Sequence, residues 1–496
     1  MATIKDYVTC RKSGKADQAE KIKKELLLSR PSMAIDLAAL GKAEYDAGEV
    51  EKSLELYDIA LEFVPPENKE LVMFSADILN SKGASLRKLG QPEAALKCYT
   101  EATRINPNLI AALYNTAILY YMRNEFQLCL EAYHKILSID PDDTDVLNNM
   151  AVVYSDIKQY HNALACYELV IHLKPEHPFA YLNKSLLLLA LGQFEEGWKI
   201  YESRWDRDAT AVKNSVKFDK PVWLGKEDLT GKCLLIHSEQ GLGDTIQFCR
   251  YANTLSKQGV KILLQVQESL KVLFRDSLDP WIEIYGENDK IPEEYDFHIP
   301  IMSLPLALKT TENTIPNEVP YLWAIDATKL TKWRTIIGQS KKIKIGLVLS
   351  GSTINYTDSH TYKRRWINLD NLAPVLELDY EFHVIQKDLS PLAFNTLDKY
   401  PQVKTYCDEI SDFSDTAALI EEMDLIISID TSVAHLAGAM GKKVWILLPY
   451  SADFRWMIDR GDTPWYPTAI LFREPTVNSW DIVGKDIAKE LVNVFH

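Results

Sequence analysis

The sequence predicts a helical N-terminal half followed by two α/β lobes. Two observations carry this prediction. In the first half, a tyrosine and a proline each recur every 34 residues. In the second half, short apolar runs alternate with stretches of helical periodicity, the pattern of a parallel sheet covered by helices. The predicted fold class is therefore α plus α/β, a solenoid of helical repeats followed by two lobes that each hold a parallel sheet.

Composition places the chain among multidomain globular proteins and argues against a nucleic-acid partner. Of its 496 residues 47% are hydrophobic and 25% are charged, and the net charge is −15. Such an acidic chain lacks the basic surface that binding to nucleic-acid phosphates requires. The seven scattered cysteines form no C-x-x-C pair, which favours reduced thiols. Without a signal-like N-terminus or an apolar run of 18 residues, we expect a cytoplasmic protein with no membrane span.

Three positions of the first half share the 34-residue period. They are Tyr99, Tyr133, Tyr167 and Tyr201; Pro107, Pro141 and Pro175; and the turn positions Gly90, Asn124, Lys158 and Gly192. Small residues, such as Gly83 and Ala117, let two helices pack closely, tyrosines fill the next interface, and prolines end the second helix. The pattern resembles the tetratricopeptide repeat. We expect these repeats over residues 34–211, after a helical cap at residues 1–33.

Asparagine also recurs every 34 residues, at Asn115, Asn149 and Asn183, on the first helix of three successive repeats. In the nucleocytoplasmic protein O-glycosyltransferases that carry such repeats, a comparable row of amides holds an extended polypeptide by its backbone. That resemblance implies acceptor binding by these three residues. The alternative is that asparagine is simply frequent at this position of the repeat, whatever the repeats bind.

The alternation of apolar runs and helical stretches in the second half predicts one lobe at residues 217–320 and another at residues 321–496. Each is expected to contain a doubly wound parallel sheet. Expected strands are residues 233–237, 261–266, 281–285 and 297–301 in the first lobe, and residues 343–349, 382–386, 403–406, 425–429 and 444–448 in the second. Expected helices are residues 245–258, 416–423 and 482–495, the last of which is expected to return to the first lobe.

Two segments of this half each follow a buried strand and open a helix. Residues 238–245 read Ser-Glu-Gln-Gly-Leu-Gly-Asp-Thr, and residues 428–435 read Ser-Ile-Asp-Thr-Ser-Val-Ala-His. A helix N-terminus offers free N–H groups and the positive end of the helix dipole, which suit a diphosphate. The two segments therefore predict one ligand held between two lobes.

The motifs of these segments resemble the ADP-heptose glycosyltransferases, glycosyltransferase family nine. The likeness rests on Gly-Leu-Gly-Asp at 241–244, Lys-Arg-Arg at 363–365 and Asp-Thr-Ser-Val-Ala-His-Leu-Ala-Gly at 430–438. Leu-Leu-Pro-Tyr at 447–450 and Asp-Thr-Pro-Trp-Tyr-Pro at 462–467 are similar to bacterial proteins that fuse tetratricopeptide repeats to such a domain. The resemblance implies a GT-B domain of twin Rossmann-like lobes, with the acceptor on the first lobe and the nucleotide sugar on the second. The chain departs from that family at Ser432, where glycine is usual.

Two residues of the first lobe are candidates for the general base. By resemblance, Asp244 takes the proton of the acceptor hydroxyl while the nucleotide leaves from the opposite face of the sugar. The alternative is that Asp244 only caps a helix. His237, at the end of the first strand, is the second candidate, because imidazole titrates near neutrality. Its alternative is an orienting or buried hydrogen-bonded group.

Donor binding is expected at residues of both lobes. They are Gly243, Ser352, Lys363, Arg364, Gln386, Asp430, Thr431, Ser432 and His435. Thr431 and Ser432 would receive the diphosphate, and Lys363 would neutralise it as it departs. The alternatives are a strand-end cap at Asp430 and a solvated run of charges at 363–365. No strand of the catalytic half carries an Asp-x-Asp motif, so no metal or other cofactor is expected.

The sequence is thus interpreted as an inverting, metal-independent glycosyltransferase. It would move a sugar from a nucleotide-diphosphate donor to a polypeptide acceptor held by the repeats. One alternative is transfer to a glycan or lipid-linked acceptor, with the repeats docking a partner protein. Another is a repeat scaffold without catalytic activity.

Overall fold

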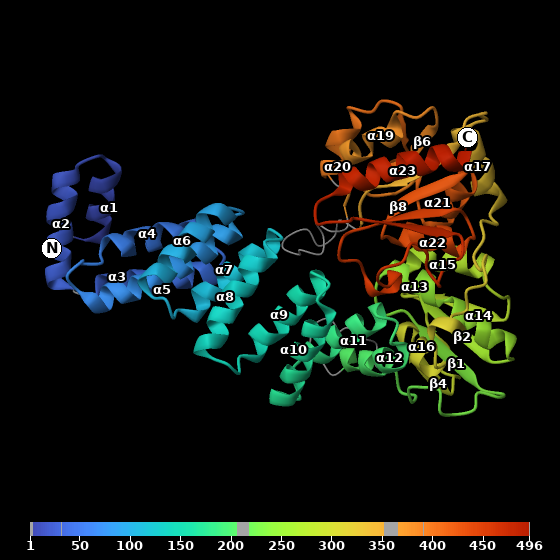
Figure 1. The fold of residues 1–496 in the computed structure, drawn as a ribbon, viewed down its shortest axis with the longest axis horizontal. Coiled ribbons are helices and arrows are strands. Elements are labelled where there is room, and N and C mark those ends of the chain that lie inside the picture. The colour runs from blue at the N-terminus through green and yellow to red at the C-terminus, as the bar shows by residue number, and fades with distance from the viewer. Residues whose placement is uncertain (1–2, 31, 206–217, 352–365, 390, 496) are drawn as a thin grey trace. The chain divides into compact units, whose positions relative to one another are not determined.

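The computed structural model describes residues 3–30, 32–205, 218–351, 366–389 and 391–495. The chain divides into two compact units, residues 1–175 and 176–496, which are described separately below. Helical hairpins come first, and two parallel α/β sheets follow in the C-terminal part (Figure 1). The predicted fold class is confirmed. None of the described helices is long and apolar enough to cross a membrane.

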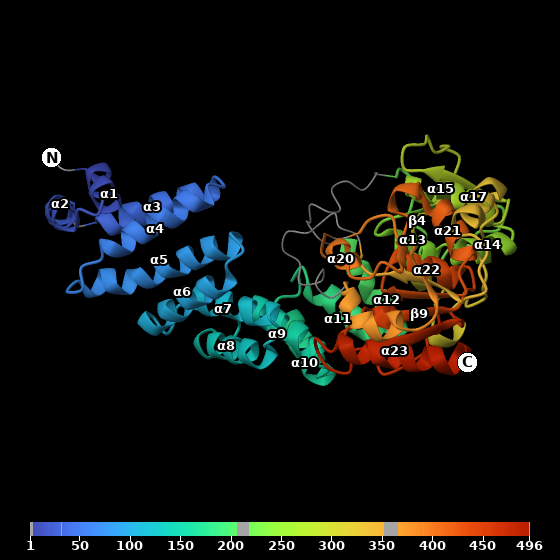
Figure 2. The same ribbon diagram turned by 90° about the horizontal axis from the view of Figure 1, so that it is seen from above.

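The first unit is built from antiparallel helical hairpins. Its helices are α1 (Ile4–Lys12), α2 (Ala16–Ser29), α3 (Met33–Asp46), α4 (Val50–Glu62), α5 (Lys69–Lys88), α6 (Pro92–Ile105), α7 (Ile110–Met122), α8 (Phe126–Ile139), α9 (Thr144–Asp156) and α10 (Tyr160–Leu173). From α3 onward, consecutive helices pack in pairs and run side by side, as Figure 2 shows for α3 with α4 and α5 with α6.

The tyrosine of the 34-residue period fills the space that a small residue leaves open. A Cβ on Gly83 of α5 would lie 2.4 Å from the ring of Tyr99 of α6, so only glycine admits that ring. Gly41 of α3 and Tyr57 of α4 repeat the arrangement at 2.8 Å. Tyr99 also belongs to a cluster with Leu119 of α7, so it fills the interface with the next hairpin as predicted.

The periodic turn position adopts the left-handed backbone conformation. The φ angles are +73° at Gly90, +59° at Asn124, +63° at Lys158 and +76° at Gly192. Each residue follows the first helix of a hairpin, where a left-handed residue ends the helix and reverses the chain. The periodic prolines come two residues after α6, α8 and α10 end, as predicted.

The second unit begins with a further helical hairpin and continues into two lobes. The hairpin consists of α11 (Ala180–Ala190), α12 (Phe194–Tyr201) and the 3₁₀ turn η1 (Glu202–Trp205). The first lobe contains β1 (Cys233–His237), α13 (Leu242–Phe248), α14 (Arg250–Lys257), β2 (Lys261–Val266), α15 (Glu268–Ser277), β3 (Ile282–Gly286), β4 (Phe297–Pro300), η2 (Ile301–Ser303), α16 (Leu304–Ala307) and η3 (Glu312–Thr314). The second lobe contains α17 (Ala327–Ile337), β5 (Lys344–Val348), η4 (Leu369–Leu372), α19 (Ala373–Leu376), β6 (Glu381–Val384), α20 (Pro391–Leu397), β7 (Val403–Thr405), η5 (Cys407–Glu409), α21 (Phe413–Glu421), β8 (Leu425–Ile429), α22 (Ser432–Ala439), β9 (Val444–Leu448), η6 (Phe454–Trp456), β10 (Ala469–Arg473) and α23 (Trp480–Phe495).

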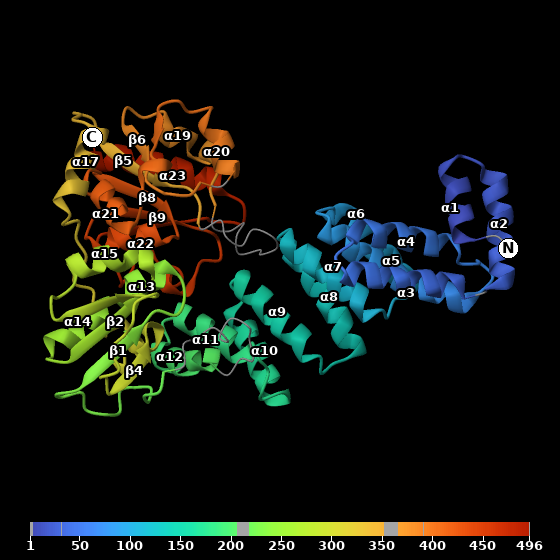
Figure 3. The same ribbon diagram turned by 180° about the vertical axis from the view of Figure 1, so that it is seen from behind.

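Both sheets are parallel, and in each the strand order reverses at one point. The first sheet has the order β3-β2-β1-β4, and the second has the order β10-β9-β8-β5-β6-β7. Figure 3 shows β2, β1 and β4 of the first sheet and β9, β8, β5 and β6 of the second. Strands β1, β8 and β9 are buried along their whole length, which explains why they read as continuous apolar runs. The order reverses between β1 and β4 and between β5 and β8. Ligands of open α/β sheets bind at the carboxyl ends of the strands at such reversals.

The first hairpin of the second unit shares its core with the two lobes. The Trp198 ring of α12 packs edge-on against Phe248 of α13, with centroids 6.0 Å apart, and against Phe454 of η6, at 5.9 Å. The contact boundary therefore falls after residue 175, ahead of this hairpin. The predicted boundaries at residues 34, 211, 217 and 321 remain predictions.

Three details of the α/β part differ from the sequence prediction. The helix expected over residues 245–258 is two helices that meet at Cys249, where the Arg250 Nε–H donates to the Gln247 carbonyl at 2.8 Å. Strand β10 was not predicted. Helix α23 packs on α19, η4 and β10 of its own lobe, so the expected return to the first lobe is wrong. Its apolar face, with Val483 and Ile487, completes the core beneath the second sheet.

Candidate active site between the two lobes

The two segments that the sequence singles out meet where the lobes join. Helix α13 packs against α22 (Figure 1). A Cβ on Gly243 would lie 2.9 Å from Cδ2 of His435 and 3.5 Å from the Cα of Ser432. Any larger residue at position 243 would therefore force the helices apart. Glycine here allows two helices from different lobes to touch, a role that the sequence did not reveal.

Asp244 links the first lobe to the second. Its Oδ2 accepts the Gly241 N–H at 2.8 Å, as a helix-capping carboxylate does, and its Oδ1 pairs with the Arg455 guanidinium of η6. Arg455 also bonds Asp453 at 2.7 Å. Burial disfavours the charge on Arg455, but Asp244 and Asp453 outweigh burial and raise the pKa of the guanidinium. Asp244 is thus held from both lobes.

His435 lies in a buried aromatic setting on α22. Its Nδ1 is 2.9 Å from the Tyr466 hydroxyl, and its ring stacks on Trp456 with centroids 5.1 Å apart. Its Nε2 lies 3.8 Å from Oδ1 of Asp430, which directly follows β8. The structure therefore brings together Asp430 and His435, two of the predicted donor-binding residues. Trp456 and Tyr466 are buried, as expected for core residues.

Thr431 and Ser432 form the start of α22. Thr431 is the N-cap residue, and its Oγ1 accepts the Ala434 N–H at 3.5 Å and lies 3.1 Å from Oγ of Ser428. Ser432 is the first residue of the helix. Thr431 and Ser432 are both partly exposed.

Gln386 uses its amide to hold the backbone that leaves β5. Its Oε1 accepts the Leu349 N–H at 2.6 Å and the Ser350 N–H at 3.3 Å, and its Nε2 donates to Oγ of Ser350 at 2.9 Å. The side chain is buried. Gln386 therefore shapes the segment after β5, and its contact with a donor remains a prediction. Ser352, Lys363 and Arg364 lie outside the described residues.

Three of the predicted donor residues, Asp430, Thr431 and Ser432, lie at the reversal of the strand order in the second lobe. Ser350 and Gly351 follow β5, and residues 430–432 follow β8, the neighbouring strand. Carboxyl ends of neighbouring parallel strands share one edge of the sheet, so these two segments lie at the edge where such sheets bind ligands.

His237 is buried beside another histidine. Its Nε2 lies 3.2 Å from Nδ1 of His298, and its ring lies 4.5 Å from that of Phe218. Burial, with a smaller contribution from His298, lowers the pKa of His237 to about 3. Its imidazole is therefore neutral near pH 7 and a weak proton acceptor, which suits the alternative of a buried hydrogen-bonded group better than that of a base.

Several buried polar atoms around α13 and η6 have no hydrogen-bond partner among the described residues. They are Oγ1 of Thr245, Nε2 and Oε1 of Gln247, Nε of Arg455 and Nε1 of Trp456. Buried polar groups in folded proteins are nearly always satisfied by protein, water or ligand. The lobe junction thus has polar groups that no described residue satisfies.

The asparagines of the repeats connect neighbouring helices in the first unit. Asn115 donates from Nδ2 to Oδ1 of Asn80 at 2.9 Å, and Asn149 donates from Nδ2 to the Tyr114 hydroxyl at 2.8 Å. Each bond reaches 35 residues back to the preceding repeat. Asn183 lies on α11, in the second unit, and is partly exposed. Peptide binding by these asparagines remains a prediction.

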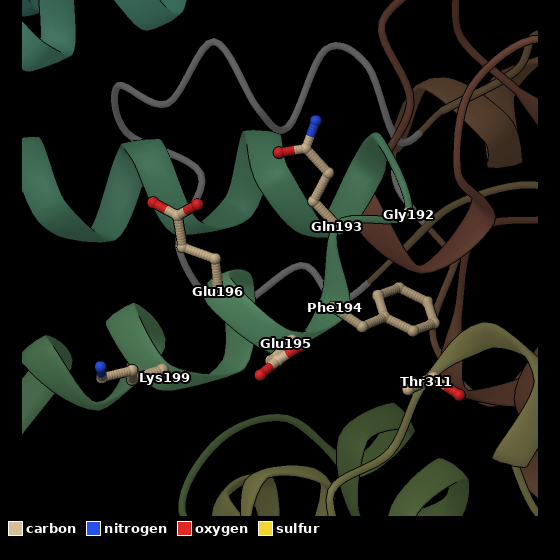
Figure 4. A pocket seen from close by; sticks show the side chains of 7 residues that line it. All are labelled: Gly192, Gln193, Phe194, Glu195, Glu196, Lys199 and Thr311. Atoms are coloured by element: carbon tan, nitrogen blue, oxygen red, sulfur yellow. The ribbon is translucent and has the colours of Figure 1, made fainter.

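A shallow pocket of about 490 Å³ lies at the start of α12 (Figure 4). Its lining residues are Gly192, Gln193, Phe194, Glu195, Glu196, Lys199 and Thr311. None of the predicted site residues lines it, and its charges are mixed in sign. The candidate site is therefore placed at the α13–α22 junction and not in this pocket. Among the residues that the structure describes, no three His, Cys, Asp or Glu side chains gather as metal ligands would.

Arg204 of η1 is a buried residue of this region that the sequence did not single out. Its guanidinium forms two bonds to the Glu239 carboxylate, from Nε at 2.9 Å and from Nη2 at 3.0 Å. Glu239 belongs to the same 238–245 segment as Asp244. A glutamate that is buried in the 238–245 segment requires a cationic partner. That requirement could have indicated that an arginine such as Arg204 lies nearby.

Comparison with known proteins identifies the helical hairpins. Residues 76–109, 111–143 and 144–177 each match the family described as tetratricopeptide repeat. The hairpins over residues 76–177 therefore match tetratricopeptide repeats. Protein FlbA of Caulobacter vibrioides is 25% identical to this chain over 324 residues, which is 60% of this chain. The matched region covers 52% of FlbA, so the chain spans about half the length of that relative.

Two solved structures of helical-repeat proteins each match about a third of the chain. A tetratricopeptide repeat protein from Parabacteroides merdae is 22% identical and covers 36% of this chain and 68% of its own, with a TM-score of 0.33. MamA from Desulfovibrio magneticus is 16% identical and covers 36% of this chain and 98% of its own, with a TM-score of 0.31. At these scores neither structure bears on function.

Proposed function

We propose that this protein is an inverting glycosyltransferase that takes a sugar from a nucleotide diphosphate and transfers it to a polypeptide recruited by the tetratricopeptide repeats. The observation that carries the proposal is the arrangement at the strand reversal of the second lobe. There, residues 430–432 after β8 and Ser350 after β5 lie at one edge of the sheet, and α22 begins at that edge. This is the edge at which parallel α/β sheets bind nucleotides.

The diphosphate of the donor would lie at the N-terminus of α22. The free N–H groups of Ser432 and Val433 and the hydroxyl of Thr431 would bind its oxygens. Lys363 and Arg364, by the family resemblance, would add the positive charge that stabilises the departing diphosphate. Asp430 and His435, 3.8 Å apart, would bind sugar hydroxyls.

Asp244 would act as the base from the opposite lobe. In the transfer, the acceptor oxygen forms a bond to the anomeric carbon while the bond from that carbon to the phosphate oxygen breaks. The electron pair leaves with the nucleoside diphosphate, and Asp244 receives the acceptor proton. Arg455 supports this role because the ion pair fixes the direction in which the Asp244 carboxylate points.

The proposal is tested first by ligand binding. The full-length protein would be screened against nucleotide sugars for thermal stabilisation and for release of the nucleoside diphosphate. A donor present at 100 times its dissociation constant should add about 2.7 kcal/mol to stability. If no nucleotide sugar stabilises the protein or is turned over, with or without polypeptide, the proposal fails.

Lys363→Ala then tests the phosphate contact, with Lys399→Ala as its control. Lys399 is an exposed lysine of the same lobe that pairs with Asp370 at 2.7 Å and has no proposed part in binding. We expect Lys363→Ala to weaken binding of the free nucleoside diphosphate by about 1.5–3 kcal/mol, the range for hydrogen bonds to charged groups. Lys399→Ala should bind like the wild type in calorimetry. Equal affinity of both variants would remove Lys363 from the site.

A further inference from the structure

The guanidinium of Arg204 lies at the strand reversal of the first lobe. It bonds Glu239, in the loop that follows β1, and Oγ of Ser303, in the turn that follows β4, at 2.7 Å. Strands β1 and β4 are the neighbours between which the order of the first sheet reverses. A residue of the helical hairpin α11–α12–η1 therefore occupies the place where a parallel sheet normally receives a ligand.

Every N–H group of this guanidinium has an acceptor. Besides the bonds to Glu239 and Ser303, Nη1 donates to the Tyr201 carbonyl at 3.2 Å and to the Glu202 carboxylate at 2.7 Å. Only 6% of Arg204 is exposed. Burial disfavours its charge, but Glu239 and Glu202 outweigh burial and raise its pKa. A fully paired guanidinium has one geometry, which a lysine ammonium cannot reproduce.

Two consecutive residues of the loop at 238–245 bond to this hairpin. Glu239 bonds Arg204 and also accepts the Met302 N–H at 2.9 Å. Gln240 donates from Nε2 to the Tyr201 hydroxyl at 2.9 Å. The far end of the same loop is fixed by Asp244, which pairs with Arg455 of the second lobe. The loop is therefore anchored at one end by the hairpin and at the other by the second lobe.

We propose that Arg204 is a positioning residue that sets the loop carrying Asp244, so that the hairpin α11–α12–η1 is part of the catalytic unit and not only of the repeat array. The inference rests on the proposed function. Arg204 acts through Glu239 and the loop backbone, without touching the reacting atoms. A catalytic group displaced by about 1 Å can lose about 100-fold in rate, so fixing this loop matters for turnover.

Two conservative variants of the full-length protein test the inference. Arg204→Lys keeps the charge and removes the bidentate fork, and Tyr201→Phe removes one hydroxyl and keeps the ring. The controls lose equivalent groups elsewhere in the same unit. Arg460→Lys removes the fork that Arg460 forms with Asp462 at 2.7 and 2.9 Å, and Tyr251→Phe removes the hydroxyl that lies 2.9 Å from Oγ1 of Thr310.

The variants are compared by hydrogen exchange of the amides of residues 238–248 and by kcat and KM for the donor. We expect faster exchange in Arg204→Lys and Tyr201→Phe than in their controls. In Arg204→Lys, kcat should fall about tenfold or more, while the donor KM stays within about twofold, because the donor binds the second lobe. If Arg204 had only a structural role, Arg204→Lys would lower stability and leave both kcat and KM unchanged.

Each remaining outcome overturns the inference. Unchanged exchange in Arg204→Lys would show that Arg204 does not restrain residues 238–248. Faster exchange with an unchanged kcat would show that restraint of these residues does not affect turnover. The failure of the proposed function is distinguishable from either result. In that case the wild type turns over no nucleotide sugar, while the exchange data still decide whether Arg204 fixes residues 238–248.

Discussion

Gly243 of the first lobe lies directly against the ring of His435 of the second. A Cβ at position 243 would come within 2.9 Å of Cδ2 in that ring. The ring cannot swing aside at low cost, because it is stacked on Trp456 and bonded to the Tyr466 hydroxyl. This contact makes the packing of α13 on α22 sensitive to a single methyl group.

Gly243→Ala should therefore destabilise the second unit. We expect a loss of about 1–3 kcal/mol, the usual cost of adding a methyl group to a tightly packed core. Gly461→Ala is the matched control, since a Cβ there meets no atom within 4 Å. Urea unfolding of both variants measures the difference. Equal midpoints would mean that the two helices are less closely packed than the structure shows.

Asp244→Asn separates catalysis from capping. Asparagine keeps an oxygen that can accept the Gly241 N–H but cannot take a proton, so transfer should fall by roughly 100- to 10,000-fold while donor affinity changes little. Asp326→Asn is the control, because Asp326 caps α17 through the N–H groups of Thr328 and Lys329. Activity and melting temperature are measured for both. Wild-type turnover by a folded Asp244→Asn protein would leave Asp244 as a cap and a partner of Arg455.

The neutral His237 predicts a loss of stability in acid. Its pKa in the folded protein, about 3, lies below the ordinary value of 6.5. As pH falls from 6.5 towards 3, His237 therefore becomes protonated in the unfolded chain but stays neutral in the folded protein. The stability from His237 is fully present above pH 6.5, and about 2 kcal/mol of it should be lost between pH 7 and pH 5. Burial likewise lowers the pKa of the adjacent His298, which adds to the effect.

His237→Gln should flatten this dependence in calorimetry at pH 7 and pH 5. His172→Gln, at an exposed position on α10, serves as the control and should keep the wild-type slope. If His237→Gln retains the full acid sensitivity, another group is responsible for it.

The asparagines of the repeats are tested together. A neutral hydrogen bond contributes about 0.5–1.5 kcal/mol, so a single Asn→Ala change should be nearly silent. The triple change at Asn115, Asn149 and Asn183 should raise the KM for a polypeptide acceptor about tenfold or more and leave turnover of a small acceptor unchanged. Asn162→Ala, on the exposed side of α10, is the control.

Melting curves must accompany that comparison, because Asn115 and Asn149 also bond Asn80 and Tyr114. A triple variant that is less stable but glycosylates polypeptide with the wild-type KM would assign these asparagines to repeat packing alone.

Local patterns in the sequence were enough to predict most of the fold. The 34-residue period reflects real contacts, such as Tyr99 against Gly83, and the buried strands read as apolar runs because both faces of each sheet are covered. Strand β10 was missed because its five residues follow a proline-rich turn and carry little periodic signal. The break at Cys249 was missed because α13 and α14 form one continuous periodic stretch.

The candidate site was predictable only where its residues stand in motifs. Asp430 and His435 are close in sequence and close in space. Arg455 and Arg204 lie far in sequence from Asp244 and Glu239, and only the folded chain brings them together. The contact of Gly243 with His435 could not be predicted for the same reason, since the two residues belong to different lobes.

The aromatic contacts of Trp198 have a consequence for synthesis of the chain. Trp198 and Tyr201 leave the ribosome early, yet their packing partner Phe454 is made near the end. At about 5–20 residues per second, this interval is on the order of tens of seconds. During that time the hairpin α11–α12 presents uncovered aromatic surface. We therefore expect nascent chains that stop short of η6 to bind chaperones or aggregate, and chains that extend beyond β10 to escape both.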